Sequence, residues 1–256
     1  MDLFYRVFGN GSPVIILHGL LGMSDNWISI AKKIAEKHTV FLPDLRNHGN
    51  SPHSDDFDLE VLTDDIIELV HNLKIKNAVI IGHSLGGRIA ISAVLKYPDL
   101  FSKIIVVDIA PRRYTGNRSI SGLLHIMNRI DLDTKKNIAE IDEAMKPLIS
   151  DIRIRQLVLK NIIKDDEGIY KWKSNLKVIT EKIEALMTPV FDEVQYKKPA
   201  LFIKGGKSDF ITQDDYAIIY RYFSKADIEI IQNAGHWVHT DEPQLFLEKV
   251  MLFIKN

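Results

Sequence analysis

The chain has 256 residues, 46% of them apolar, which is enough for one sizeable core in a single domain or a domain with an insertion. Its 33 basic and 34 acidic residues give a formal net charge of −1, so the sequence offers no electrostatic footprint for nucleic acid or an anionic membrane, and a small-molecule ligand is favoured. The absence of cysteine excludes disulfides, cysteine-based zinc sites and a cysteine nucleophile.

The amino-terminal sequence contains no basic segment followed by a long apolar region, the pattern of a secretory signal. No apolar stretch approaches the length of about 20 residues that a membrane-spanning helix needs. We therefore expect a cytoplasmic protein without stable membrane insertion.

Short apolar runs alternate with longer amphipathic segments along the chain. The short runs are rich in β-branched residues and predict parallel strands buried on both faces: Val14–Leu17, Val40–Leu42, Ala78–Ile81, Ile104–Val107, Ala200–Ile203 and Ile228–Ile231. The longer segments predict helices: Trp27–Glu36, Leu59–Leu73, Leu85–Tyr97, Asp214–Phe223 and Gln244–Ile254. This alternation predicts an α/β protein with a mostly parallel, doubly wound sheet.

One long segment interrupts this alternation between the fourth and fifth strand runs. Residues 112–194 contain no convincing strand, and Lys135–Met145 and Ile152–Ile163 have the pattern of amphipathic helices. We predict a helical cap over 112–194, inserted into a core made of 1–111 and 195–256. Its position in the chain would place it over the carboxyl ends of the strands, where ligands bind in such sheets.

A Gly-x-Ser-x-Gly pattern, Gly82-His83-Ser84-Leu85-Gly86, joins the third predicted strand to the following helix. This pattern is typical of a nucleophile elbow, a sharp turn that exposes the serine hydroxyl for attack. The two glycines leave room for the strand and the helix to pass close together. The sequence therefore predicts Ser84 as a nucleophile.

A serine hydroxyl needs a base within hydrogen-bond reach and an acid that orients the base. His236 follows the last predicted strand and is the expected base, whereas His239 is expected to pack or to begin a helix. Two aspartates remain candidates for the acid. Asp209 has the chain order Ser, Asp, His that this arrangement favours, and Asp108 directly ends the fourth strand run.

Backbone amides after the first predicted strand complete the expected site. The loop His18-Gly19-Leu20-Leu21-Gly22 and the elbow would supply the Leu20 and Leu85 N–H groups as an oxyanion hole, with His18 bracing the loop. Trp27 is a candidate wall of the acyl pocket. Arg46 would either contact a polar part of the substrate or, as we favour, hold its own loop by hydrogen bonds.

Together these residues resemble the α/β-hydrolase family over essentially the whole chain. Three further segments are similar to YbfF-type and ABHD11-like esterases: Pro43–Pro52, Val107–Pro111 and Gly235–His239. The resemblance implies hydrolysis of esters or thioesters in a capped acyl pocket, without cofactor or metal. Some of these relatives lack an acid at the later position and use the earlier aspartate, so Asp108 and Asp209 both stay open.

The sequence thus predicts a serine carboxylesterase or acyl thioesterase that acts through an acyl-enzyme intermediate. Two other functional hypotheses are compatible with the same fold. One is a related capped hydrolase that cleaves carbon–carbon bonds or performs perhydrolysis without a cofactor. The other is a ligand-binding or signalling module that turns over little.

Overall fold

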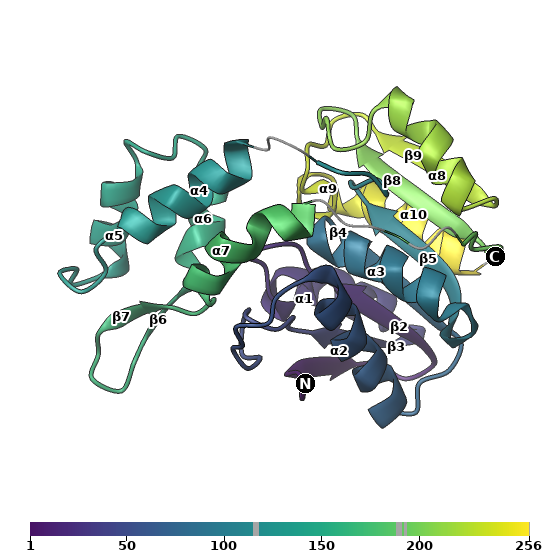
Figure 1. Cartoon of the computed structure of the whole chain (residues 1–256), viewed down its shortest axis with the longest axis horizontal. Helices are drawn as coiled ribbons and strands as arrows, with labels where there is room; N and C mark the ends of the chain where they lie inside the picture. Colours follow the sequence, from purple (N-terminus) through teal and green to yellow (C-terminus); the bar gives the residue numbers. More distant parts are fainter. Residues whose placement is uncertain (115–117, 188–190, 192–193, 256) are drawn as a thin grey trace.

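The computed structural model describes residues 1–114, 118–187, 191 and 194–255, and its core is a seven-stranded sheet (Figure 1). The strands lie in the order β1-β3-β2-β4-β5-β8-β9. All neighbours are parallel except β1 and β3, which pair antiparallel at one edge. The strands are β1 (Tyr5–Phe8), β2 (Ser12–Leu17), β3 (His38–Pro43), β4 (Ala78–His83), β5 (Phe101–Val107), β8 (Ala200–Gly205) and β9 (Ala226–Ile231).

Helices cover both faces of this sheet. The helices α2 (Leu59–Asn72), α3 (Leu85–Lys96) and α8 (Tyr216–Tyr222) pack on one face, and α1 (Ile28–Ile34) and α10 (Pro243–Lys255) pack on the other. Short helical turns complete the core: η1 (Ser24–Trp27), η2 (Pro98–Leu100), η3 (Gln213–Asp215) and α9 (Val238–Asp241).

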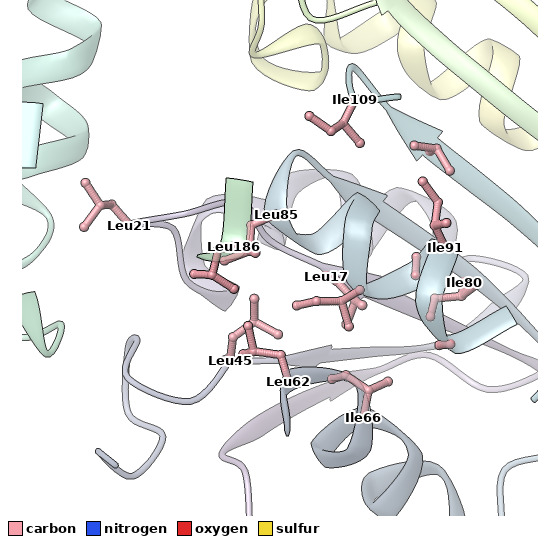
Figure 2. Close-up of a cluster of buried hydrophobic side chains, with 14 of the residues drawn as sticks. Leu17, Leu21, Leu45, Leu62, Ile66, Ile80, Leu85, Ile91, Ile109 and Leu186 are labelled. Atoms are coloured by element: carbon pink, nitrogen blue, oxygen red, sulfur yellow. The ribbon is translucent and has the colours of Figure 1, made fainter. Parts of the chain in front are cut away.

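Strand residues alternate between the two faces, as the period of two requires. Ile80 belongs to the apolar cluster under α2 and α3, whereas Ile81 belongs to the cluster under α1 and α10. Figure 2 shows Leu17 and Ile80 near Leu62 and Ile66 of α2. The prediction of a mostly parallel α/β sheet buried on both faces is therefore confirmed.

The segment between β5 and β8 forms a separate group of helices beside the sheet (Figure 1). We refer to its described residues 118–187 as the cap segment. It contains α4 (Arg118–Arg129), α5 (Ile138–Met145), α6 (Ile152–Leu159), β6 (Ile162–Lys164), β7 (Tyr170–Trp172) and α7 (Leu176–Met187). Residues 115–117, 188–190 and 192–193, near the two predicted boundaries, lie outside the described part of the chain.

Two strand features differ from the sequence prediction. The cap segment contains an antiparallel hairpin, β6–β7, where only helices were expected, because its three-residue strands are too short to give a period. Asp165 makes the turn, since its carboxylate accepts from the amides of Glu167 (3.0 Å) and Ile169 (2.8 Å). The edge strand β1 was also missed, because its residues are only partly buried.

No helix in the described ranges is both long and apolar enough to cross a bilayer.

Candidate active site

Ser84 lies in a strained turn between β4 and α3. Its backbone has φ 53° and ψ −114°, a conformation that a residue with a Cβ rarely adopts. The Ser84 amide donates to Val107 O on the neighbouring strand (3.1 Å), which ties the turn to the sheet. The predicted elbow geometry is thus present at this serine.

The glycines that flank Ser84 are required by close backbone contacts. A Cβ at Gly82 would lie 2.2 Å from the carbonyl oxygen of Gly86, and a Cβ at Gly86 would lie 2.4 Å from that of Leu17. Both separations are far below van der Waals contact, so any side chain would force the strand and helix apart. The Gly-x-Ser-x-Gly spacing is therefore a steric requirement of this turn.

His236 lies on the loop after β9 and pairs with Asp108 at the end of β5. His236 Nδ1 and Asp108 Oδ2 are 2.8 Å apart, and the carboxylate is completely buried. The ring of Phe210 stacks on the imidazole with a centroid separation of 3.9 Å. His83 Nε2–H donates to the His236 carbonyl at 2.8 Å, so the residue before Ser84 also fixes the histidine loop.

The carboxylate of Asp108 is held by the loop after β8. The Gly205 amide donates to Oδ1 at 3.0 Å, and the Ser208 hydroxyl donates to Oδ2, the oxygen that pairs with His236. Asp108 also has a positive φ of 51°, which marks a second strained residue at this edge of the sheet. Asp209, by contrast, is exposed, and within the described residues no hydrogen bond joins it to His236.

The loop after β2 lies against Ser84 as predicted. A Cβ at Gly19 would lie 3.3 Å from the Cβ of Ser84. His18 Nε2 accepts from the Leu45 amide (2.9 Å), so its Nδ1 carries the proton and donates to Gly19 O (2.8 Å). Among the described residues, none accepts a hydrogen bond from the amide of Leu20 or Leu85. Both N–H groups are thus available for an oxyanion.

A cavity of about 1070 Å³ opens at Ser84 and His236. Its apolar lining includes Leu20 from the core and Ile126 and Leu157 from the cap segment. Polar groups also line it, among them the ion pair of Arg153 with Asp241, at 3.2 Å, between the cap segment and the core. The core and the cap segment together therefore form an acyl-sized cavity over the serine.

Trp27 forms part of the cavity wall, as predicted for a pocket residue. It is almost completely buried, and its ring stacks on His239 with a centroid separation of 3.8 Å and an interplanar angle of 13°. Its contact with a substrate stays a prediction.

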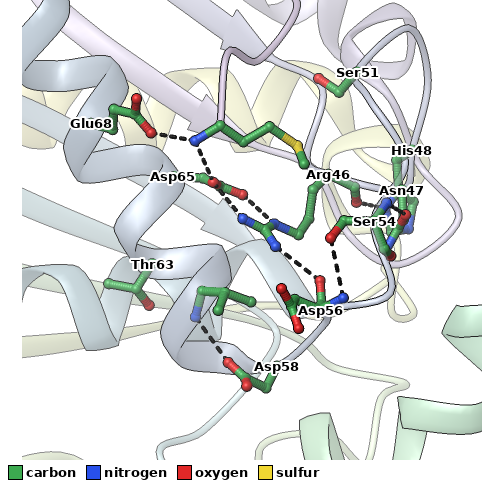
Figure 3. A network of polar contacts seen from close by, with 12 residues as sticks. Arg46, Asn47, His48, Ser51, Ser54, Asp56, Asp58, Thr63, Asp65 and Glu68 are labelled. Atoms are coloured by element: carbon green, nitrogen blue, oxygen red, sulfur yellow. Dashed lines mark hydrogen bonds and ion pairs between the residues drawn. The ribbon is translucent and has the colours of Figure 1, made fainter.

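Arg46 makes hydrogen bonds within the core, which is the role that the sequence favours over contact with a substrate. Its guanidinium makes two hydrogen bonds to Asp65, at 2.5 and 2.7 Å, and a third to Asp56 O at 2.9 Å (Figure 3). It does not belong to the described residues that line the cavity. These bonds fit the structural role of Arg46. All three nitrogens of the buried guanidinium already donate within the core, so none presents a free pair of donors to a substrate.

Buried histidines surround the site and are kept neutral by their surroundings. Burial, followed by the nearby charge of His236, lowers the pKa of His239 to about 3. Burial also lowers the pKa of His48 to about 3 and that of His83 well below its usual value. These rings therefore act as packing and hydrogen-bonding groups at neutral pH.

We expect these histidines to make the fold sensitive to acid. Because the folded pKa of His239 lies below the unfolded value near 6.5, its contribution to stability is complete above that value and is lost as the pH falls toward 3. Each such group removes up to about 1.4 kcal/mol per pH unit in this window. Urea unfolding at about pH 7.5 and about pH 5 should show a smaller difference for His239→Phe than for the native chain.

The exposed His125 supplies the control for this test, and His125→Gln should keep the native pH dependence. An unchanged pH dependence in His239→Phe would contradict the assignment of a buried neutral imidazole.

Comparison with known proteins supports the family resemblance over the full chain. The family model described as alpha/beta hydrolase fold matches residues 12–243. The chain is 34% identical over 267 aligned positions to the sn-1-specific diacylglycerol lipase ABHD11 of Danio rerio, covering 100% of this chain and 83% of that protein. It is 28% identical to the esterase YbfF of Escherichia coli (strain K12), covering 96% and 94%.

A solved structure titled marine microorganism esterase has the same architecture. It superposes with a TM-score of 0.96 at 37% sequence identity, covering 98% of this chain and 99% of that one. The predicted resemblance to ABHD11-like and YbfF-type proteins is thus confirmed. The chain belongs to the α/β-hydrolase family.

Proposed function

We propose that this chain is a serine carboxylesterase or acyl thioesterase that uses Ser84, His236 and Asp108. One observation carries the proposal: a strained, pocket-facing serine shares its cavity with an imidazole whose Nδ1 lies 2.8 Å from a buried carboxylate. Nucleophilic catalysis by serine requires these three groups: the nucleophile, its general base and the acid that orients the base.

In the first half of the reaction, His236 takes the proton of the Ser84 hydroxyl as the oxygen attacks the carbonyl carbon. The Leu20 and Leu85 amides stabilise the negative charge that develops on the carbonyl oxygen. His236 then gives its proton to the leaving alcohol or thiol, and the acyl group stays on Ser84. Asp108 stabilises the imidazolium through the Nδ1 hydrogen bond.

In the second half, a water molecule repeats the attack on the acyl-enzyme with His236 as base. The tetrahedral intermediate collapses, the proton returns to the Ser84 oxygen, and the carboxylic acid leaves. Because the same groups serve both halves, an interaction that stabilises the oxyanion acts twice in each turnover.

The apolar side chains that line the cavity favour an apolar acyl group as the recognised part of the substrate. The names of two relatives, a diacylglycerol lipase and an esterase, support an ester substrate. We therefore propose esters or thioesters of apolar acyl chains, with the polar leaving group toward the ion pair of Arg153 with Asp241.

A hydrolysis panel tests the proposal. It pairs p-nitrophenyl esters with acyl-coenzyme A thioesters of matched chain length, from two carbons to about sixteen, a range that a cavity of this class can hold. We expect turnover that rises with chain length beyond acetyl, and the ratio between the two series identifies the preferred leaving group. No turnover with either series would contradict the proposal and favour a binding module.

A further inference from the structure

The cap segment reaches the oxyanion loop through one buried side chain, Asn161. This residue follows α6 and is completely buried. Its Nδ2 donates to Leu21 O in the core at 2.7 Å and to Leu157 O within its own segment at 3.0 Å. The contact with Leu21 spans 140 positions of the chain.

The amide of Asn161 has a fixed orientation. The carbonyl oxygens of Leu21 and Leu157 can only accept, so they fix Nδ2 as the atom that faces them, and Oδ1 accepts the hydroxyl proton of Ser174 at 2.5 Å. The Asn161 carbonyl accepts from the Lys173 amide at 2.6 Å, and this bond holds the residue to the chain directly after β7. The donor is therefore aimed at the loop by the fold of the cap segment.

The loop that Asn161 holds is a strained turn. The Gly22 amide donates to Gly19 O at 2.9 Å, and Leu21, in the third position of this turn, has a φ of 58°. A type II turn needs a positive φ there and normally has Gly or Asn. For a residue with a side chain, this conformation costs roughly 1–2 kcal/mol, so outside contacts must maintain it.

Two planar peptide groups connect Asn161 to the expected oxyanion donor. The Leu21 carbonyl and the Gly22 N–H belong to one rigid peptide group, and Gly22 N–H donates to Gly19 O. The Gly19 carbonyl and the Leu20 N–H belong to a second rigid peptide group. A fixed Gly19 carbonyl therefore also fixes the direction of the Leu20 N–H. Asn161 thus acts on the Leu20 amide without touching the substrate.

We propose that Asn161 is a positioning residue: through its hydrogen bond to Leu21 O, the geometry of the oxyanion hole depends on the contact between the cap segment and the core. This inference rests on the proposed serine hydrolase function. When the Asn161 contact is made, the Leu20 N–H is held toward the developing charge. When it is lost, the strained turn relaxes and the Leu20 donor is misaligned, while the lining that the cap segment supplies, such as Ile126, stays in place.

The test compares Asn161→Ala with a matched asparagine of the cap segment. Asn128 donates its Nδ2 to Leu124 O (2.8 Å) and to the Thr180 hydroxyl (2.9 Å), both within the cap segment. Asn128→Ala therefore also removes two hydrogen bonds of an asparagine Nδ2, but none of them reaches the oxyanion loop. Hydrolysis of a p-nitrophenyl ester gives kcat and KM separately, and a trifluoromethyl ketone, which forms an anionic tetrahedral adduct with serine, reports on the oxyanion hole.

We expect Asn161→Ala to lower kcat about 10- to 100-fold with KM nearly unchanged, and to weaken the trifluoromethyl ketone by a similar factor. Asn128→Ala should change neither value more than about twofold. Ser174→Ala removes the hydrogen bond to the buried Oδ1 of Asn161 and so weakens the hold on this amide. It should lower kcat in the same direction by about three- to tenfold, and it decides the question if Asn161→Ala does not fold.

An unchanged kcat in the folded Asn161 and Ser174 variants would overturn the inference, and so would an increase in KM alone. Ser84→Ala in the same assay separates this failure from a failure of the proposed function. If Ser84→Ala is inactive while Asn161→Ala and Ser174→Ala keep full kcat, only the positioning role is overturned. If Ser84→Ala keeps its turnover, the proposed function and the inference both fall.

Discussion

Ser84→Ala is expected to reduce ester hydrolysis by about 10⁵-fold, the largest effect that we predict for any single substitution. The variant keeps the pocket and the oxyanion amides, so the substrate still binds, but no oxygen is left to form the acyl-enzyme. Residual turnover of roughly 10³-fold over water would come from binding and charge stabilisation alone. Steady-state hydrolysis of a p-nitrophenyl ester, with the background rate subtracted, measures the loss.

The elbow itself should survive this change, because alanine also has a Cβ and the flanking glycines remain. A thermal midpoint within a few degrees of the native value is the control for folding. Turnover in Ser84→Ala above about one tenth of the native rate would contradict the role of Ser84 as nucleophile.

Asp108→Asn is expected to lower kcat by about 10³- to 10⁴-fold while Asp209→Asn changes it less than about twofold. The reason is the contact at His236 Nδ1, which the buried Asp108 makes at 2.8 Å. An asparagine there cannot stabilise the imidazolium, and it can turn its amide toward the ring and select the wrong tautomer. Asp209 is exposed, so its change removes only surface charge.

The pair of variants is measured in one assay, with kcat and KM determined separately. Losses of equal, small size in both would contradict the assignment of Asp108, and a large loss in Asp209→Asn alone would transfer the role to Asp209. The KM of Asp108→Asn should stay near the native value, because Asp108 is not among the described residues that line the cavity.

Much of this molecule could be predicted from the sequence because the decisive signals are local. The elbow shows as a five-residue pattern, because close backbone contacts exclude a side chain at Gly82 and Gly86 on either side of Ser84. Short apolar runs predict the buried strands, and His236 lies on the loop that follows the last of them. The predicted fold and family are confirmed on this basis.

The choice between Asp108 and Asp209 could not be made locally. Their strands β5 and β8 are parallel neighbours, so both residues emerge at the same edge of the sheet within reach of a histidine loop. In the structure His236 Nδ1 lies beside Asp108, and contacts from the other strand's loop hold that carboxylate, since Gly205 and Ser208 donate to it. These contacts are the basis for proposing Asp108 as the acid. No local sequence signal identifies Ser208 as a partner of Asp108, because the contact joins residues 100 positions apart.

Contacts between distant segments also decide the roles of Arg46 and Asn161. Arg46 lies after a predicted strand at the functional edge, yet its partner Asp65 on α2 turns it away from the cavity. Asn161 carries no motif, and its bond to Leu21 depends on how the cap segment folds back over the core. Such roles come from tertiary packing, which short-range periodicity does not encode.

Labelling with a fluorophosphonate tests the central claim most directly, because the reagent forms a stable covalent bond only with an activated serine. The account predicts one adduct per chain, found by mass spectrometry on the peptide that contains Ser84, with complete loss of hydrolysis and no adduct in Ser84→Ala. An enzyme that hydrolyses esters but is labelled at a different serine, or not at all, would contradict it.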